Sequence, residues 1–273
     1  MRSTAYSLTT GIITVSISPV AAFVNTFCHS LLKKSQVLSA KHRNFLFSID
    51  KTVALMYTES IKKTAQTLSY KRGTDMKWYK YNINDMTEQL YQGYLAMMCE
   101  CRRARVENKS LHEDRARSVA AEMLLRMALS ETFGVSEEDI TILEDEHGAP
   151  YADKIDVHVS ISHSGDYAVC AIADCPVGID IEKIRPINMR VAERTFSVGE
   201  LEYLGADGKM TDEVLLRFYE IWTAKEAYGK MLGTGILLKD TVDTAKLENI
   251  QREYPNGYVI SIITQKTLKE KAT

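Results

Sequence analysis

The stretch 157–182, VHVSISHSGDYAVCAIADCPVGIDIE, contains three runs of apolar or alternating residues. Gly, Asp and Pro residues, which favour turns, separate these runs from one another. Valine, isoleucine and tyrosine, which are common in β-strands, recur within the runs. Short runs of this kind are typical of antiparallel strands and hairpins. The sequence therefore predicts strands at 157–161, 167–173 and 177–181.

Outside this stretch, apolar residues recur at helical spacing. The segments 88–105 and 110–133 each place a stripe of apolar side chains on one face of a helix. Ser110 and Glu113 match a capping box at the start of the second helix, and Gly134 ends it. The remaining predicted elements are a helix at 211–232 and strands at 78–83, 140–143 and 258–263. This order of helices and strands predicts the α+β fold class.

Composition is that of an ordinary globular protein of one or two domains, with 273 residues, 45% hydrophobic and 26% charged. The net charge of -2 is the sum of a basic segment 1–76, with 10 Lys/Arg and 3 Asp/Glu, and an acidic remainder. The basic residues are scattered and are not interleaved with an aromatic RNA-binding motif, so nucleic acid is not an expected partner. The five cysteines lack zinc-site spacing and fit a reducing, cytoplasmic compartment.

Residues 1–75 differ in character from the rest of the chain. The stretch 7–28 carries no charge, but its serines, threonines, proline and asparagine make it a poor membrane-spanning helix. The regular alternating pattern begins abruptly at Met76. We therefore expect residues 1–75 to be an extra N-terminal segment that is disordered or not part of the working protein, with Met76 as a candidate true start.

Two carboxylates stand at alternate positions in the run 177–182. Because alternate residues of a strand point to the same face, Asp180 and Glu182 share one side. Two like charges on one side are tolerated when they are solvated, or when a hard divalent cation such as Mg²⁺ lies between them. The run alone leaves both interpretations open, a solvent-facing strand edge and a metal site.

A second charged pair lies on the predicted helix at 211–232. Glu226 and Lys230 are one helical turn apart, which is also the spacing of an ordinary surface ion pair. Trp222 lies on the Glu226 face and indicates that this face is partly covered. A charged pair under such cover favours a functional site.

Ser162, His163 and Ser164 invite comparison with a serine nucleophile and its base. The sequence lacks the G-x-S-x-G elbow of such enzymes. Adjacent residues of a strand also point to opposite faces, so neither serine can easily transfer a proton to His163. The tract is otherwise explained as a hairpin entry whose hydroxyls satisfy backbone groups.

Four collinear tracts together resemble the surfactin-synthetase-activating type of 4'-phosphopantetheinyl transferase. They are Ser162-His163-Ser164, Gly178 to Glu182 followed by Lys183 and Pro186, Arg194 to Ser197 with Glu200, and Trp222 to Lys230. The resemblance covers residue 77 to the end and implies a pseudo-dimer of two similar α+β halves, at 77–174 and 175–273, with the active site between them. It implies no counterpart for residues 1–75.

The resemblance also implies roles for individual residues. Asp180, Glu182 and Glu226 correspond to Mg²⁺ ligands, Glu226 also to a general base, and Lys230 to a contact of the coenzyme phosphates. The other implied contacts of coenzyme A are Arg102, Arg105, Arg117, His163 and Lys225. Glu200 matches a proposed catalytic acid, but a capping box with Ser197 explains it equally well.

One tract departs from the pattern of the family. Gly148-Ala149-Pro150 lacks the basic residue that relatives place between the glycine and the proline, so this tract does not supply one of the implied phosphate contacts.

The implied activity is Mg²⁺-dependent transfer of 4'-phosphopantetheine from coenzyme A to a serine of an apo carrier protein, with release of 3',5'-ADP. A monomer that needs neither membrane nor nucleic acid is expected. The alternatives are a binding module without catalysis and another Mg²⁺-dependent phosphoryl-transfer enzyme, although no P-loop is present.

Overall fold

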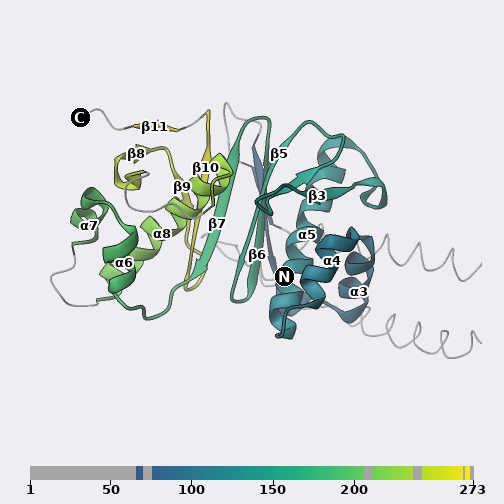
Figure 1. Ribbon diagram of the computed structural model, residues 1–273, viewed down its shortest axis with the longest axis horizontal. Coiled ribbons are helices and arrows are strands. Elements are labelled where there is room, and N and C mark those ends of the chain that lie inside the picture. Colours follow the sequence, from purple (N-terminus) through teal and green to yellow (C-terminus); the bar gives the residue numbers. More distant parts are fainter. Residues whose placement is uncertain (1–65, 70–75, 206–210, 236–241, 267, 271–273) are drawn as a thin grey trace, which may run out of the picture. The chain divides into compact units, whose positions relative to one another are not determined.

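The computed structural model describes residues 66–69, 76–205, 211–235, 242–266 and 268–270 (Figure 1). The expectations for residues 1–65, including the uncharged stretch 7–28, lie outside the described residues. Residues 66–69 belong to the segment that the sequence sets apart, and they form an edge strand of the first sheet. Among the helices of the described residues, none is both long and apolar enough to cross a bilayer.

The first sheet is antiparallel and has the strand order β1, β2, β6, β5. Its strands are β1 (Gln66–Ser69), β2 (Lys77–Asn82), β5 (His158–Ser164) and β6 (Tyr167–Ala173). Helix α5 (His112–Phe133) packs against this sheet through a buried apolar stripe. Short elements complete this half: the 3₁₀ helices η2 (Ile83–Asp85) and η3 (Glu137–Asp139), and the hairpin of β3 (Ile142–Glu144) and β4 (Pro150–Ala152).

Residues 88–105 form parts of two helices, α3 (Glu88–Met97) and α4 (Glu100–Glu107), so the prediction of one helix is wrong. Met98 and Cys99 between them have extended backbone. The Arg126 guanidinium of α5 donates to the carbonyl oxygen of Met97 at 2.8 Å and replaces the next hydrogen bond within the helix. A buried residue that is distant in sequence therefore stabilises the break.

The start of α5 also differs from the prediction. The helix begins after Leu111, which has no polar side chain, so the capping box expected at Ser110 and Glu113 is not formed. The end is as predicted, because Gly134 adopts the left-handed conformation (φ 68°) that favours glycine.

The second half contains a sheet of strand order β7, β10, β9, covered by the long helix α8. Thr211 caps α8 by accepting a hydrogen bond from the Val214 N–H, and Gly233 ends the helix, both as predicted. The elements are β7 (Val177–Lys183), α6 (Arg190–Thr195), α7 (Val198–Leu204), α8 (Asp212–Leu232), η4 (Thr244–Lys246), β8 (Leu247–Glu248), β9 (Gln251–Glu253), β10 (Tyr258–Thr264) and β11 (Lys269–Glu270).

The two sheets share one hydrophobic core. Trp78, Val169 and Ala171 of the first sheet form one cluster with Ile179 and Ile260 of the second. Figure 1 shows β5, β6, β7 and β10 in the centre, with α3 to α5 on one side and α6 to α8 on the other. The chain therefore has the predicted α+β fold, in which two halves meet through their sheets.

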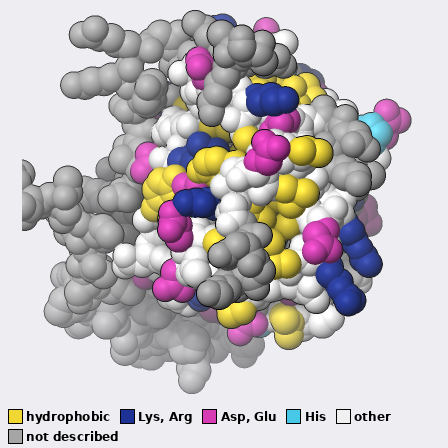
Figure 2. Space-filling model, turned by 90° about the vertical axis from the view of Figure 1, so that its left-hand side faces the viewer, with side chains coloured by type: hydrophobic (Ala, Val, Ile, Leu, Met, Phe, Trp, Pro, Cys, Tyr) yellow, Lys and Arg dark blue, Asp and Glu magenta, His cyan; other side chains and the backbone are white. Residues whose placement is uncertain are grey.

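The outer side of the second half is of mixed character. Figure 2 looks onto this side and shows hydrophobic side chains interspersed with charged ones. Exposed hydrophobic residues on α6, α7 and the loop after β9 include Val191, Val198, Tyr203 and Tyr254. The Glu220 carboxylate accepts hydrogen bonds from the Tyr203 and Tyr254 hydroxyls, at 2.8 and 2.6 Å.

Candidate active site

The edge of β7 faces the serines of β5. The Ser162 hydroxyl donates to Asp180 Oδ1 at 2.7 Å, and the Ser164 hydroxyl donates to Glu182 Oε2 at 2.7 Å. The expectation that Asp180 and Glu182 share one side is therefore confirmed. Both serines point toward the acids of β7 and not toward His163, in agreement with the rejection of a serine nucleophile.

Helix α8 reaches this edge because Gly178 has no side chain. A Cβ atom at Gly178 would lie 2.7 Å from the carbonyl carbon of Ala227 and 2.9 Å from the backbone nitrogen of Met231. The close approach brings Lys230 to β7, where its ammonium donates to Asp180 Oδ1 at 2.7 Å and to the Ile179 carbonyl at 3.2 Å.

Three carboxylates lie near one another at this junction. Burial, and then the negative charge of Asp180, raise the pKa of Glu226 to about 6, and Glu182 adds to the effect while Lys230 opposes it. The pKa of Glu182 is likewise raised by burial and then by Asp180. Asp180, Glu182 and Glu226 therefore repel one another, which is the electrostatic setting that a bound cation would relieve.

The donors at this junction suit a hard divalent cation. Asp180 Oδ2 is buried and has no hydrogen-bond partner in the described part of the chain. Carboxylate oxygens are the ligands that Mg²⁺ prefers. Within the same described part, however, no three His, Cys, Asp or Glu side chains are already arranged around a common metal position. The chemistry of the donors fits Mg²⁺, and the assignment of ligands stays a prediction.

A pocket of about 550 Å³ opens beside the carboxylates, between the two halves. The first half contributes residues of α4, α5, β5 and the β3–β4 turn, and the second half contributes the end of α8. The lining includes Arg102, Arg105 and Lys109, with Lys230 on the opposite half. Glu144 is the one acid that lines the pocket among the described residues. The pocket therefore carries mainly positive charge, which suits an anionic ligand.

His163 also lines this pocket, on the side of β5 opposite to the serines. Burial lowers the pKa of His163 to about 4, with further lowering by the positive charges of Lys109, Arg117 and Lys230. The imidazole is therefore neutral at pH 7 in the free protein. A phosphate group placed among the same cations would favour its protonated form.

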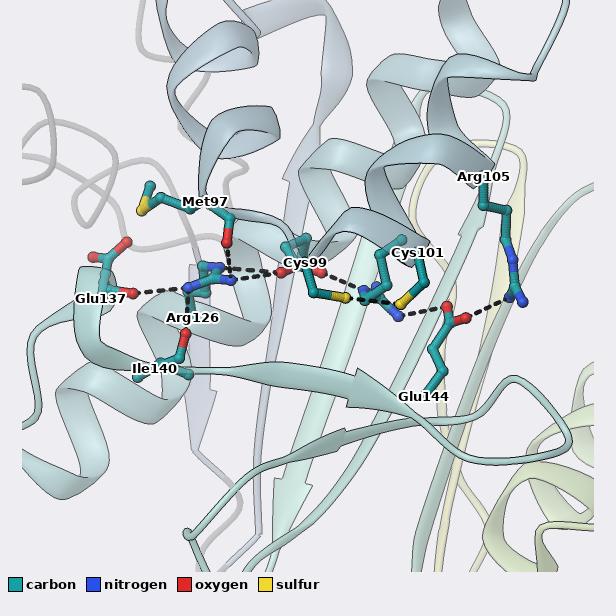
Figure 3. A network of polar contacts seen from close by, with 10 residues as sticks. Met97, Cys99, Cys101, Arg105, Arg126, Glu137, Ile140 and Glu144 are labelled. Atoms are coloured by element: carbon teal, nitrogen blue, oxygen red, sulfur yellow. Dashed lines mark hydrogen bonds and ion pairs between the residues drawn. The ribbon is translucent and has the colours of Figure 1, made fainter.

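The pocket arginines end a chain of alternating charges, part of which Figure 3 shows. Arg105 donates to Glu144 Oε2 at 2.9 Å, and Arg102 donates to Glu144 Oε1 at 2.7 Å. Arg102 also donates to Glu122 at 2.7 Å, and Glu122 pairs with Arg126 at 2.9 Å in the interior. Three arginines and two glutamates leave one net positive charge, and Arg105 is the most exposed member.

The predicted coenzyme contacts are only partly brought together. Arg102, Arg105, His163 and Lys230 line one pocket. Arg117 is instead bonded to the Gly165 carbonyl at 2.8 Å and to the Asp114 carboxylate. Gly148, Ala149 and Pro150 do line the pocket, but Ala149 provides no charge.

Glu200 and Lys225 form a separate buried pair. The Lys225 ammonium donates to Glu200 Oε2 at 2.9 Å and to the Val242 carbonyl at 3.0 Å. Glu200 also completes a capping box with Ser197 and accepts from Thr244. Lys225 therefore does not point into the pocket, and a structural role accounts for every contact of Glu200 in the described residues.

Sequence reasoning missed Lys109 and Glu144. Lys109 follows α4 and carries no motif, although it continues the basic character of the segment that contains Arg102, Arg103 and Arg105. Glu144 gave no signal, because its importance comes from two arginines about forty residues earlier in the chain.

Comparison with known proteins gives a consistent result. A model of the 4'-phosphopantetheinyl transferase superfamily matches residues 176–271, and a model of the N-terminal part of 4'-phosphopantetheinyl transferases matches residues 85–175. The chain is 39% identical over 126 residues to 4'-phosphopantetheinyl transferase gsp of Aneurinibacillus migulanus, a match that covers 46% of this chain and 52% of the relative.

Two Bacillus proteins are similar to a comparable degree. Identity is 38% to 4'-phosphopantetheinyl transferase Sfp of Bacillus subtilis (strain 168), over 46% of this chain and 56% of the relative. It is 35% to another 4'-phosphopantetheinyl transferase of Bacillus subtilis, over 54% of this chain and 66% of the relative. The matched part of the chain thus spans about half to two thirds of the length of these curated relatives.

Proposed function

Because this chain belongs to the 4'-phosphopantetheinyl transferase superfamily, we propose that it transfers 4'-phosphopantetheine from coenzyme A to a serine of an apo carrier protein and releases 3',5'-ADP. The position of Lys230 carries this proposal. Its ammonium is bonded to Asp180, and the residue also lines the basic pocket. The same cation therefore contacts the carboxylate cluster and the pocket that suits an anionic ligand. A diphosphate bound in the pocket would extend to the carboxylates through this residue.

The reaction forms a bond between the serine oxygen and the β-phosphorus of coenzyme A and breaks the bond from that phosphorus to the leaving 3',5'-ADP. Lys230 would stabilise the negative charge on the diphosphate and the leaving group. Asp180, Glu182 and Glu226 would hold Mg²⁺, which when bound neutralises diphosphate charge. A Glu226 carboxylate oxygen would accept the proton of the serine hydroxyl.

The remaining pocket residues would bind the nucleotide. Arg102, Arg105 and Lys109 offer donors to its phosphates, and His163 would gain a proton and donate to a phosphate oxygen. Lys225 and Glu200 are paired with each other, so we propose for them a role in holding α7 and α8 together and no contact with coenzyme A.

The test is transfer to an apo carrier domain in the presence of coenzyme A and Mg²⁺, followed by mass spectrometry of the carrier. The expected result is a mass gain of one phosphopantetheine arm. Absence of this gain with fatty-acid, polyketide and peptide carriers, while 3',5'-ADP still binds, would favour a binding module without catalysis.

Asp180→Ala tests the carboxylates within the same assay. We expect the transfer rate to fall by a factor of about a hundred or more, because the change removes a carboxylate that would bind Mg²⁺. The protein should remain folded, because the change removes little core volume. Asp174→Ala is the matched control, since Asp174 is half-exposed in the turn before β7 and pairs with Lys266 at the surface. Equal activity of the two variants would contradict the proposed site.

A further inference from the structure

The turn between β5 and β6 belongs to the first half but is bonded to the second half. The Asp166 N–H donates to the Tyr258 hydroxyl oxygen at 2.8 Å, and the same hydroxyl donates to Asp166 Oδ2 at 2.8 Å. The Lys183 ammonium donates to Asp166 Oδ2 at 3.1 Å. We call Asp166, Lys183 and Tyr258 the clasp.

The backbone of this turn fits closely against the clasp. A Cβ atom at Gly165 would collide with the Tyr258 hydroxyl and lie 2.8 Å from Cδ of Lys183. The positive φ of Gly165 (53°) also favours glycine. On its other side, the Gly165 carbonyl accepts from Arg117 at 2.8 Å. The turn is thus fixed from both halves at once.

Residues of the candidate site are covalent neighbours of the clasp. Ser164, which donates to Glu182, lies two residues before Asp166, and Lys183 follows Glu182 directly. The Lys183 N–H in turn donates to the Ser164 hydroxyl oxygen at 3.1 Å. A shift of the turn would therefore change the position of His163 relative to the carboxylates of β7.

The Tyr258 side chain has two separable parts. Its ring is buried and packs edge-on against Tyr167, with centroids 4.9 Å apart, and this packing belongs to the shared core. Its hydroxyl is bonded to Asp166 and interacts with the Lys183 ammonium, so its polar contacts lie within the clasp. Replacement by phenylalanine removes the hydroxyl and keeps the ring.

We propose that Tyr258 is a positioning residue, whose hydroxyl holds the β5–β6 turn through Asp166 and so keeps the nucleotide pocket of the first half in register with the carboxylates of the second. This inference rests on the proposed function for its catalytic consequence. Apart from catalysis, it means that Mg²⁺ binding at the carboxylates and nucleotide binding in the pocket strengthen each other through the clasp. Coupling between two sites is measurable without turnover.

The test is the Kd of 3',5'-ADP for the full chain, measured by calorimetry with and without Mg²⁺. In Tyr258→Phe we expect the Kd without Mg²⁺ to rise by no more than about threefold, because His163 is the proposed phosphate contact next to the turn, while Arg102, Arg105 and Lys230 lie on other elements. The factor by which Mg²⁺ strengthens nucleotide binding is expected to fall about tenfold. The transfer kcat is expected to fall by a similar factor, since misplaced reacting groups slow the reaction.

Two further variants sharpen the result. Asp166→Asn should lower the coupling at least as much as Tyr258→Phe does, because it also weakens the pair with Lys183. The double variant should be no worse than Asp166→Asn alone, because the Tyr258 hydroxyl acts through Asp166. Tyr79→Phe is the matched control, since it removes a hydroxyl that donates to Glu131 at 3.1 Å within the first half. It should leave coupling and kcat unchanged.

The proposed role of Tyr258 would be contradicted if Mg²⁺ strengthened nucleotide binding equally in Tyr258→Phe and in the unmodified chain. It would also be contradicted if the losses of coupling in Tyr258→Phe and Asp166→Asn added up fully in the double variant. An unmodified chain that binds both ligands with coupling but transfers nothing would instead contradict the proposed function. The two failures are therefore distinguishable.

Discussion

His163 keeps an uncharged imidazole in surroundings that are rich in cations. Burial lowers its pKa to about 4, and Lys109, Arg117 and Lys230 contribute to the lowering. Between this value and the ordinary pKa of 6.5, the unfolded chain binds more protons at this residue than the folded chain does. The folded state therefore gains stability from His163 as pH rises through this range and loses it as pH falls.

His163→Gln is expected to show this dependence. The difference in unfolding free energy between the unmodified chain and the variant should rise between pH 4 and 6.5, by at most about 3 kcal/mol. Urea denaturation at a series of pH values measures it. His158→Gln, at an exposed position of the same strand, is the control. A difference for His163→Gln that is constant over this range would contradict the assigned environment.

At the residue scale, much of the site could be predicted from the alternation of side chains along a strand. Asp180 and Glu182 share a side because side chains alternate, and the same alternation separates His163 from Ser162 and Ser164. The raised pKa of Glu226 could not be predicted, nor could the buried Asp180 oxygen that has no hydrogen-bond partner among the residues that the structure describes, because both depend on how closely α8 approaches β7.

At the scale of elements, a network of charges connects α4, α5 and β3. The Glu144 carboxylate on β3 bridges Arg102 and Arg105 of α4, while Arg102 is nearly buried. Removal of one partner from a buried ion pair leaves the other charge without compensation. Glu144 should therefore matter for the stability of the first half as well as for the shape of the pocket.

Glu144→Gln is expected to lower the unfolding free energy by about 2–4 kcal/mol, because Arg102 loses the charge of one of its two carboxylate partners. Glu131→Gln serves as control, since Glu131 is half-exposed and its ion pair with Lys77 spans 3.9 Å. The control should change stability by less than about 1 kcal/mol. Urea titration measures both, and equal effects would show that the network contributes no more than a surface pair.

Element types were more predictable than element ends. Apolar runs and periodicity found β2, β6, β7, β10, α5 and α8, because each of these elements buries several apolar side chains in succession or on one face. It did not find the break at Met98, which a hydrogen bond from Arg126 stabilises, nor the start of α5 at Leu111. The two-residue strands β8 and β11 and the three-residue strands β4 and β9 are too short to produce a periodic signal.

At the scale of the whole described fold, the two halves share one hydrophobic cluster between their sheets, beside clusters that belong to the second half alone. Trp78 and Val169 from the first sheet are buried against Ile179 and Ile260 from the second, all at 1% exposure or less. Separation of the halves would expose this cluster to water, at a cost of roughly 25 cal/mol for each Å² of apolar surface. The candidate site lies on the same junction, so we expect the two halves to fold together with the assembly of the site.

Ile260→Ala tests whether the two halves unfold together. Loss of a fully buried isoleucine is expected to lower the unfolding free energy by about 2–5 kcal/mol. Ile260 lies on β10, but the shared core predicts that β6 of the other half loses protection at the same, lower urea concentration. Hydrogen exchange by mass spectrometry follows peptides from β6 and β10 separately, and Ile142→Ala, fully buried on β3 outside this cluster, is the control of matched size. A shift of β10 with β6 unchanged would mean that the halves unfold independently and that the site is assembled from two separately stable parts.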